Sequence, residues 1–130
     1  MNVAIFTESY TPYVNGVAVS VATFTEQLRK RGDTVYIFAP RMPGYKDEDP
    51  HVFRYPSVRT PFEPDYPLTI PKMPVLNHVL RSLPVDIIHT QSPFALGVEG
   101  ARWARRRRVP LVTTYHTMYT EYTHLSLIHI

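Results

Sequence analysis

Apolar positions along the chain follow two periods, one typical of buried strands and one typical of helices. Residues 3–6 and 35–39 are short unbroken apolar runs, the pattern of strands buried on both faces of a sheet. Between them, apolar side chains recur at helical spacing at Val17, Val21, Phe24 and Leu28. This spacing predicts a helix with one buried face, which Gly32 ends in a left-handed conformation. The order strand, helix, strand predicts parallel strands joined by a right-handed crossover.

The middle of the chain is irregular. The sequence contains 13 prolines, and eight of them fall between Pro50 and Pro84, which excludes one long helix or a central strand there. Residues 51–55 are compatible with a third short strand. Residues 73–83 carry apolar side chains at helical spacing and are expected to form a short helix, whose apolar stripe suits either the protein core or a bilayer surface.

The last part of the chain again predicts a strand, a helix and a strand. Residues 85–90 and 111–115 are the apolar runs, and the helix between them should continue to about residue 107. Ser92 is the expected N-cap of this helix and Pro93 its first residue. The whole alternation predicts an α/β fold, a Rossmann-like doubly wound parallel sheet. In such sheets ligands bind at the carboxyl ends of the strands.

Three loops should meet at that edge of the sheet, formed by residues 8–16, 91–92 and 116–117. The first loop leads into a helix N-terminus, whose free N–H groups and positive dipole attract anions. Asn15 and Gly16 at this point either let a phosphate approach the backbone closely or mark a plain turn with a positive φ. The dinucleotide fingerprint G-x-G-x-x-G is absent, which argues against an oxidoreductase that uses NAD or FAD.

Two histidines lie on or near the expected strands. His116 follows the last strand, where it can donate to a sugar hydroxyl or stabilise developing charge, or where it satisfies loop backbone groups. His89 lies inside the strand of residues 85–90, so a core histidine with satisfied hydrogen bonds is the better interpretation. None of the six histidines has zinc-site spacing and the chain has no cysteine, so we expect no metal ion.

Charged residues gather in two places. Asp47-Glu48-Asp49 matches the D-x-D motif with which sugar transferases of another fold hold a nucleotide's cation, but no apolar strand precedes it, so we expect a solvated acidic loop. Arg102 and Arg105, Arg106, Arg107 and Arg108 crowd into seven positions. This run is either a solvated helix end or a contact with anionic lipid. Nucleic acid is not an expected partner, because only Trp103 interleaves with the arginines.

Several segments together resemble the N-terminal domain of family 4 GT-B retaining glycosyltransferases. These segments are residues 2–12, 15–17, 28–35 and 86–93. Residues 115–122, Tyr-His-Thr-Met-Tyr-Thr-Glu-Tyr, are similar to the branch that glucosylates diacylglycerol and related lipids. The resemblance covers residues 1–124 and implies the acceptor-side half of a two-domain enzyme.

The resemblance implies a hexosyltransferase that moves a hexose, usually glucose from UDP-glucose, to a lipid such as diacylglycerol or to a glycan. It implies retention of configuration without a metal or other cofactor. It further implies that Gly16 and Asn15 face the donor diphosphate and that His116 contacts the transferred sugar. Glu8, Tyr10 and Glu121 would border the acceptor. The donor-binding C-terminal domain is absent from these residues, so we expect the chain alone to be inactive.

The tail and the location of the protein are separate expectations. Residues 125–130 depart from the family pattern and can be encoded by CTG TCT CTT ATA CAC ATC, the end of a common transposase-based sequencing adapter, so our hypothesis is a non-native tail. No apolar run reaches the ~18 residues of a membrane span. We expect a cytoplasmic protein, peripheral on the inner face of the plasma membrane through Arg105–Arg108. The alternative function is a non-catalytic, peripheral membrane-binding α/β module.

Overall fold

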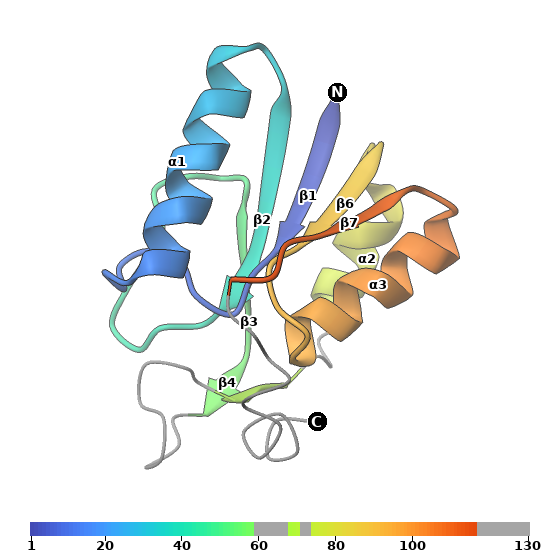
Figure 1. Cartoon of the computed structure of the whole chain (residues 1–130). Coiled ribbons are helices and arrows are strands. Elements are labelled where there is room, and N and C mark those ends of the chain that lie inside the picture. The colour runs from blue at the N-terminus through green and yellow to red at the C-terminus, as the bar shows by residue number, and fades with distance from the viewer. Residues whose placement is uncertain (59–67, 71–73, 117–130) are drawn as a thin grey trace.

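The computed structural model describes residues 1–58, 68–70 and 74–116. Its centre is a five-stranded parallel sheet in the order β3-β2-β1-β6-β7 (Figure 1). The strands are β1 (Asn2–Phe6), β2 (Thr34–Pro40), β3 (Val52–Tyr55), β6 (Ile87–Thr90) and β7 (Leu111–Thr113). A separate antiparallel pair, β4 (Ser57–Val58) and β5 (Leu68–Thr69), lies beyond the carboxyl end of β3.

Helices cover both faces of the sheet. On one face lies α1 (Gly16–Lys30), which connects β1 to β2 and packs Val21 against Ile5 and Ile37. On the other face lie α2 (Pro74–Ser82) and α3 (Ala95–Arg107), which bury Leu80 and Trp103 against the phenylalanines of β1 and β2. Two apolar cores separated by one sheet confirm the predicted doubly wound α/β fold.

The strand order reverses at β1, because β2 and β3 lie on one side of it and β6 and β7 on the other. The Gln91 N–H donates to the Phe6 carbonyl at 3.0 Å and the Thr7 N–H donates to the Phe38 carbonyl at 3.0 Å, which extends both ladders to the carboxyl edge. The topological switch point is therefore between β1 and β6. The loops that follow these two strands flank the place where doubly wound sheets bind ligands.

Both ends of α1 agree with the sequence prediction. Asn15 has extended backbone angles and its side chain accepts from the Ala18 N–H, as an N-cap should. Gly32 has a φ of 100°, and the Asp33 N–H donates to the Leu28 carbonyl at 3.0 Å. This is the hydrogen-bond pattern of a Schellman motif, which satisfies carbonyls that the helix end would otherwise leave unpaired.

The start of α3 and one helix contact differ from the prediction. The N-cap of α3 is Phe94, not Ser92, and no side chain of its own segment caps it. Instead the carboxylate of Glu8, from the loop after β1, accepts the Leu96 N–H, so a distant residue replaces the local cap. Phe24 was expected in the buried stripe of α1 but is 42% exposed, because it lies at the margin of the helix against the ring of His89.

The stripe on residues 73–83 belongs to the core. Leu76 and Leu80 of α2 are buried in the cluster beneath α3, whereas Val75 faces solvent. Because the apolar face is already covered by the sheet, the bilayer-surface interpretation of this helix is wrong. In the part of the chain that the structure describes, no helix is long and apolar enough to cross a membrane.

Candidate functional site

The loop after β1 is held in one conformation by hydrogen bonds within itself and to α1. The Asn15 side-chain carbonyl accepts from the Ala18 N–H at 2.9 Å, and its amide donates to the Ser9 hydroxyl at 2.7 Å. The Ser9 N–H in turn donates to the Thr7 hydroxyl. Asn15 therefore both caps α1 and anchors the loop that leads to it.

Gly16 is the first residue of α1, and nothing in the described structure requires a glycine there. Its backbone does not have a positive φ, unlike Gly32 and Gly44, so the turn interpretation of Gly16 is wrong. A Cβ built on Gly16 would meet no atom within 4 Å. The space in front of this helix N-terminus is open, and the missing side chain leaves the backbone accessible to a ligand.

His116 is held by the loop after β6. Its Nε2 lies 2.7 Å from the side-chain carbonyl of Gln91, and the Gln91 amide nitrogen lies 3.2 Å from Nε2 of His89. Because an amide oxygen only accepts, His116 carries its proton on Nε2 and its Nδ1 is left as an acceptor. The hydroxyl of Thr114, 2.6 Å away, completes the surroundings of His89. These contacts confirm that the loops after β6 and β7 meet.

The surroundings of both histidines favour the neutral form of the ring. Burial lowers the pKa of His116 below its ordinary value. Burial and the neighbouring His116 lower the pKa of His89 in the same direction. A neutral His116 acts on a ligand by hydrogen bonding rather than as a cation. His89 is half-buried, and its Nε2 has hydrogen-bond partners in Thr114 and Gln91, which agrees with a structural role for this histidine.

Glu8 connects three parts of this edge of the sheet. Its side chain is buried and accepts from the Leu96 N–H at 2.5 Å and from the Thr69 hydroxyl at 3.2 Å. Burial raises the pKa of Glu8 to about 7, against the lowering effect of these two hydrogen bonds. The loop after β1, the start of α3 and strand β5 are thus joined through one carboxyl group.

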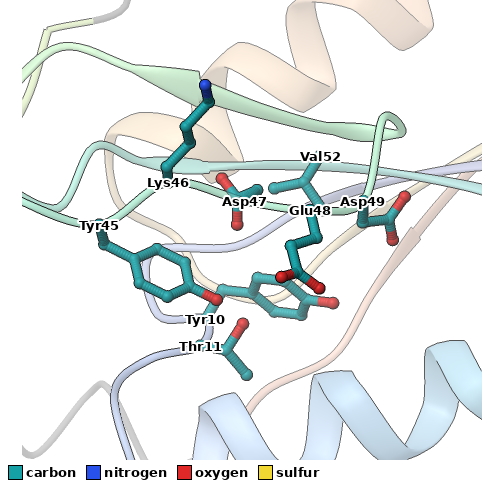
Figure 2. A pocket seen from close by; sticks show the side chains of 8 residues that line it. All are labelled: Tyr10, Thr11, Tyr45, Lys46, Asp47, Glu48, Asp49 and Val52. Atoms are coloured by element: carbon teal, nitrogen blue, oxygen red, sulfur yellow. The ribbon is translucent and has the colours of Figure 1, made fainter.

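Tyr10 lines an open pocket of 320 Å³ whose other residues come mainly from the loop after β2 (Figure 2). The acidic triplet forms part of its lining, but the expectation of a solvated loop is wrong for two of its members. Asp47 pairs with Arg54 at 2.8 Å and Asp49 pairs with Arg29 at 2.7 Å. The two ion pairs tie the loop after β2 to Arg29 of α1 and to Arg54 of β3.

The arginine run, residues 105–108, lies at the end of the sheet where the strands begin, opposite to the loops described above. Since α3 runs antiparallel to β6, its last turn returns to this end of the sheet (Figure 1). Arg107 is half-buried and donates to the Leu80 carbonyl at 2.5 Å, whereas Arg105, Arg106 and Arg108 are exposed. The structure therefore separates the run from the loops that carry Gly16 and His116.

Two residues that organise the site were not predicted from the sequence, and some predicted residues lie outside the described part of the chain. Gln91 and Arg54 organise their surroundings, but sequence reasoning assigned neither a role. For Gln91 a signal existed, since a polar residue directly after a buried strand at a switch point faces the ligand crevice. For Arg54 there was none, because no sequence pattern predicts that Asp47, Pro40 and Thr11 converge on one guanidinium. Glu121, Thr117 and residues 125–130 lie outside the described residues.

The fold is an α/β domain of the kind in which ligands bind outside the carboxyl ends of a parallel sheet. The chain belongs to glycosyltransferase family 4, whose profile matches residues 14–129. It is 35% identical over 125 residues to an alpha-monoglucosyldiacylglycerol synthase of Streptococcus pneumoniae, covering 95% of this chain and 28% of that protein. It is 38% identical over 122 residues to a GDP-mannose-dependent alpha-mannosyltransferase of Corynebacterium glutamicum, covering 90% and 29%.

A second alpha-monoglucosyldiacylglycerol synthase, from Acholeplasma laidlawii, is 35% identical over 127 residues, covering 95% of this chain and 32% of that protein. The chain thus spans about three tenths of the length of these relatives, all of which are glycosyltransferases. The crystal structure of S. aureus homoserine dehydrogenase also matches, with a TM-score of 0.42 and 14% identity over 99% of this chain and 30% of that chain. A likeness of that size carries no functional information.

Proposed function

We propose that the protein containing this chain transfers a hexose from a nucleotide sugar to a lipid or glycan acceptor, with retention of configuration and without a catalytic metal. The relatives include enzymes named for glucosyl lipid synthesis and for GDP-mannose use, so glucose and mannose are the candidate sugars. UDP-glucose and diacylglycerol are the first pair to test, because residues 115–122 are similar to the lipid-glucosylating branch.

The observation that carries this proposal is the open N-terminus of α1. The Ala18 N–H is satisfied by Asn15, but the N–H groups of Gly16 and Val17 have no hydrogen-bond partner among the described residues. These two donors and the positive end of the helix dipole suit a diphosphate, whose negative charge grows as the sugar–oxygen bond breaks. The missing Cβ at Gly16 leaves room for the phosphate to reach them.

His116 supplies the second half of the proposed site. The Nε2 proton of His116 is donated to the side-chain carbonyl of Gln91. The Nδ1 atom of His116 is therefore left to accept a hydrogen bond from a hydroxyl of the transferred sugar. Because the ring is neutral, it orients the sugar without opposing the positive charge that develops at the reacting carbon. Asn15 holds the loop beside the donor, and Glu8 fixes the walls from beneath rather than facing the acceptor directly.

The test is transfer of labelled glucose or mannose by the intact enzyme to diacylglycerol and to soluble glycans. Gly16→Ala should leave folding unchanged, because the new Cβ meets no atom within 4 Å, and should raise the KM for the donor about tenfold. Val14→Ala, at an exposed position in the same loop, is the matched control. An unchanged donor KM in Gly16→Ala would remove the helix N-terminus from the donor site.

Membrane attachment on the inner face of the plasma membrane is part of the proposal. Arg105, Arg106 and Arg108 are exposed and available to anionic lipid, at roughly 1 kcal/mol for each cation near the surface. Replacing the three by glutamine should release the protein from anionic vesicles in a sedimentation assay. If the wild-type protein binds the vesicles but transfers no sugar to any acceptor, the alternative of a non-catalytic membrane-binding module is favoured.

A further inference from the structure

Three side chains at the carboxyl ends of β6 and β7 form one chain of hydrogen bonds. Nε2 of His89 lies 3.2 Å from the amide nitrogen of Gln91, and the side-chain carbonyl of Gln91 lies 2.7 Å from Nε2 of His116. Gln91 is only 4% exposed, so both ends of its amide depend on these partners rather than on water. The chain connects a histidine inside a strand to the loop histidine at the edge of the sheet.

The sheet and α1 hold this chain of hydrogen bonds in place. The Gln91 backbone extends the ladder of β6, and the Thr114 N–H donates to the Thr90 carbonyl at 2.9 Å, which extends the ladder of β7. The ring of His89 packs against Phe24 of α1, with centroids 5.4 Å apart and ring planes at 85°. The groups are therefore positioned before any ligand binds, which lowers the cost of ordering them on binding.

The amide of Gln91 constrains both imidazole rings at once. One end of an amide group only accepts hydrogen bonds and the other end only donates them. The ring that faces the carbonyl, His116, must therefore carry a proton on Nε2, whereas the ring that faces the NH₂ group, His89, must have a bare Nε2. Burial lowers the pKa of both histidines and so favours neutral rings, which carry one proton each. The two histidines are thus opposite tautomers.

The hydroxyl of Thr114 fits the same arrangement of protons. Its oxygen lies 2.6 Å from Nε2 of His89. With the proton of His89 on Nδ1, this hydroxyl can only donate to the ring. Thr114 and Gln91 thus both donate to His89, and His116 donates to Gln91. Turning the amide over would require both rings to change tautomer together.

We propose that Gln91 and His89 are positioning residues that hold His116 in the tautomer with its proton on Nε2. Gln91 acts through His116, and His89 acts through Gln91 by fixing the direction of its amide. The use of this tautomer rests on the proposed function, in which Nδ1 of His116 accepts a hydrogen bond from a hydroxyl of the transferred sugar. In the other tautomer Nδ1 would carry the proton and could not accept.

Nitrogen NMR of the histidine rings tests the tautomers without any reaction. The intact protein is labelled with ¹⁵N-histidine, and spectra are recorded well above the pKa of both rings. The nitrogen shifts then show which nitrogen of each ring carries the proton, with signals assigned by His89→Phe and His116→Phe. We expect a protonated Nε2 in His116 and a protonated Nδ1 in His89. The same tautomer in both rings, or the reverse pair, would overturn the proposal.

Substitutions of Gln91 distinguish a positioning role from simple packing. In Gln91→Glu both oxygens accept, so His116 should keep its Nε2 proton and His89 should change to the tautomer protonated on Nε2. Gln91→Met keeps the length but has no amide, so His116 should become a mixture of tautomers. Gln27→Met, at an exposed position of α1, is the matched control and should leave both rings as in the wild type. Unchanged ring spectra in both Gln91 variants would show that Gln91 only fills space.

Kinetics of the intact enzyme separate this proposal from the proposed function. Gln91→Met should lower kcat/KM for sugar transfer about fivefold, the effect of one hydrogen bond, and Gln27→Met should not. The expected tautomers in a wild-type protein that transfers no sugar would contradict the proposed function and keep the tautomer assignment. Wild-type kcat/KM in Gln91→Met, with the tautomers of His116 mixed, would contradict the positioning role and keep the function.

Discussion

Glu8→Gln should make the protein more stable at alkaline pH and should flatten the pH dependence of its stability. The carboxyl group is buried between the Leu96 N–H and the Thr69 hydroxyl, and glutamine keeps an oxygen of the same shape at that place. What the substitution removes is the ability to ionise. Ionised Glu8 has lost its hydration and gains only two hydrogen bonds in return, so its charged form is costly in the folded state.

The magnitude follows from the pKa, which burial raises from 4.5 to about 7. Below pH 4.5 both the folded and the unfolded chains carry the proton, and the stabilisation is complete. As the pH rises towards 7, only the folded chain retains the proton, so stability is lost through this window and levels off above it. A difference of about 2.5 pH units corresponds to about 3 kcal/mol in the free energy of unfolding.

Urea unfolding at pH 4.5 and at pH 8 measures this effect. The change in the free energy of unfolding caused by Glu8→Gln is measured at each pH. The change at pH 8 should exceed the change at pH 4.5 by about 3 kcal/mol. Subtracting the two values removes any effect of a poor fit of the amide, because that effect is the same at both pH values. Glu26→Gln, at an exposed position on α1, should show no such difference. Parallel pH profiles for wild type and Glu8→Gln would refute the buried, proton-binding state of this carboxyl group.

Three further substitutions test the backbone around α3. Arg108 is not a glycine but has a positive φ of 54°, so Arg108→Gly should raise the free energy of unfolding by about 1 kcal/mol. Arg105→Gly, inside the helix, should lower it by about as much. Equal effects of the two substitutions in urea unfolding would contradict this. Gly97→Ala would place a Cβ 1.7 Å from the Ser92 carbonyl oxygen, so it should destabilise by about 3 kcal/mol and shift the NMR signals of Gln91 and His116. A wild-type melting temperature for Gly97→Ala would show that this helix start is not packed as described.

The family assignment and the first β-α-β unit could be predicted because their signals are local. The apolar runs of β1 and β2 are buried strands as predicted, whereas the run at residues 111–115 forms only the short strand β7, which is exposed at the edge of the sheet. Asn15 and Gly32 set the ends of α1 through bonds to residues within about one turn. The same locality explains why the meeting of the loops was predicted. Once the strands are parallel, the residues that follow them must lie at the same edge.

Local reasoning failed where a distant residue supplied the partner. Ser92 is a good N-cap by type, yet α3 starts later because the buried carboxylate of Glu8 accepts the Leu96 N–H. The acidic triplet has the composition of a solvated loop, yet Arg29 and Arg54 draw Asp49 and Asp47 into ion pairs. No spacing in the sequence encodes either contact.

The sequence by itself determined the α/β class, the strand order of the first unit and the family, since each depends on periodicity and short segments. Only the tertiary structure decided that neither sterics nor backbone angles require a glycine at position 16. It also decided that the Nε2 proton of His116 is donated to Gln91. Finally, it placed the arginine run at the end of the sheet where the strands begin, away from Gly16 and His116. The physical reason is that burial, tautomer and charge pairing are properties of a residue's neighbours in space, and those neighbours are assembled by the fold from segments far apart in the chain.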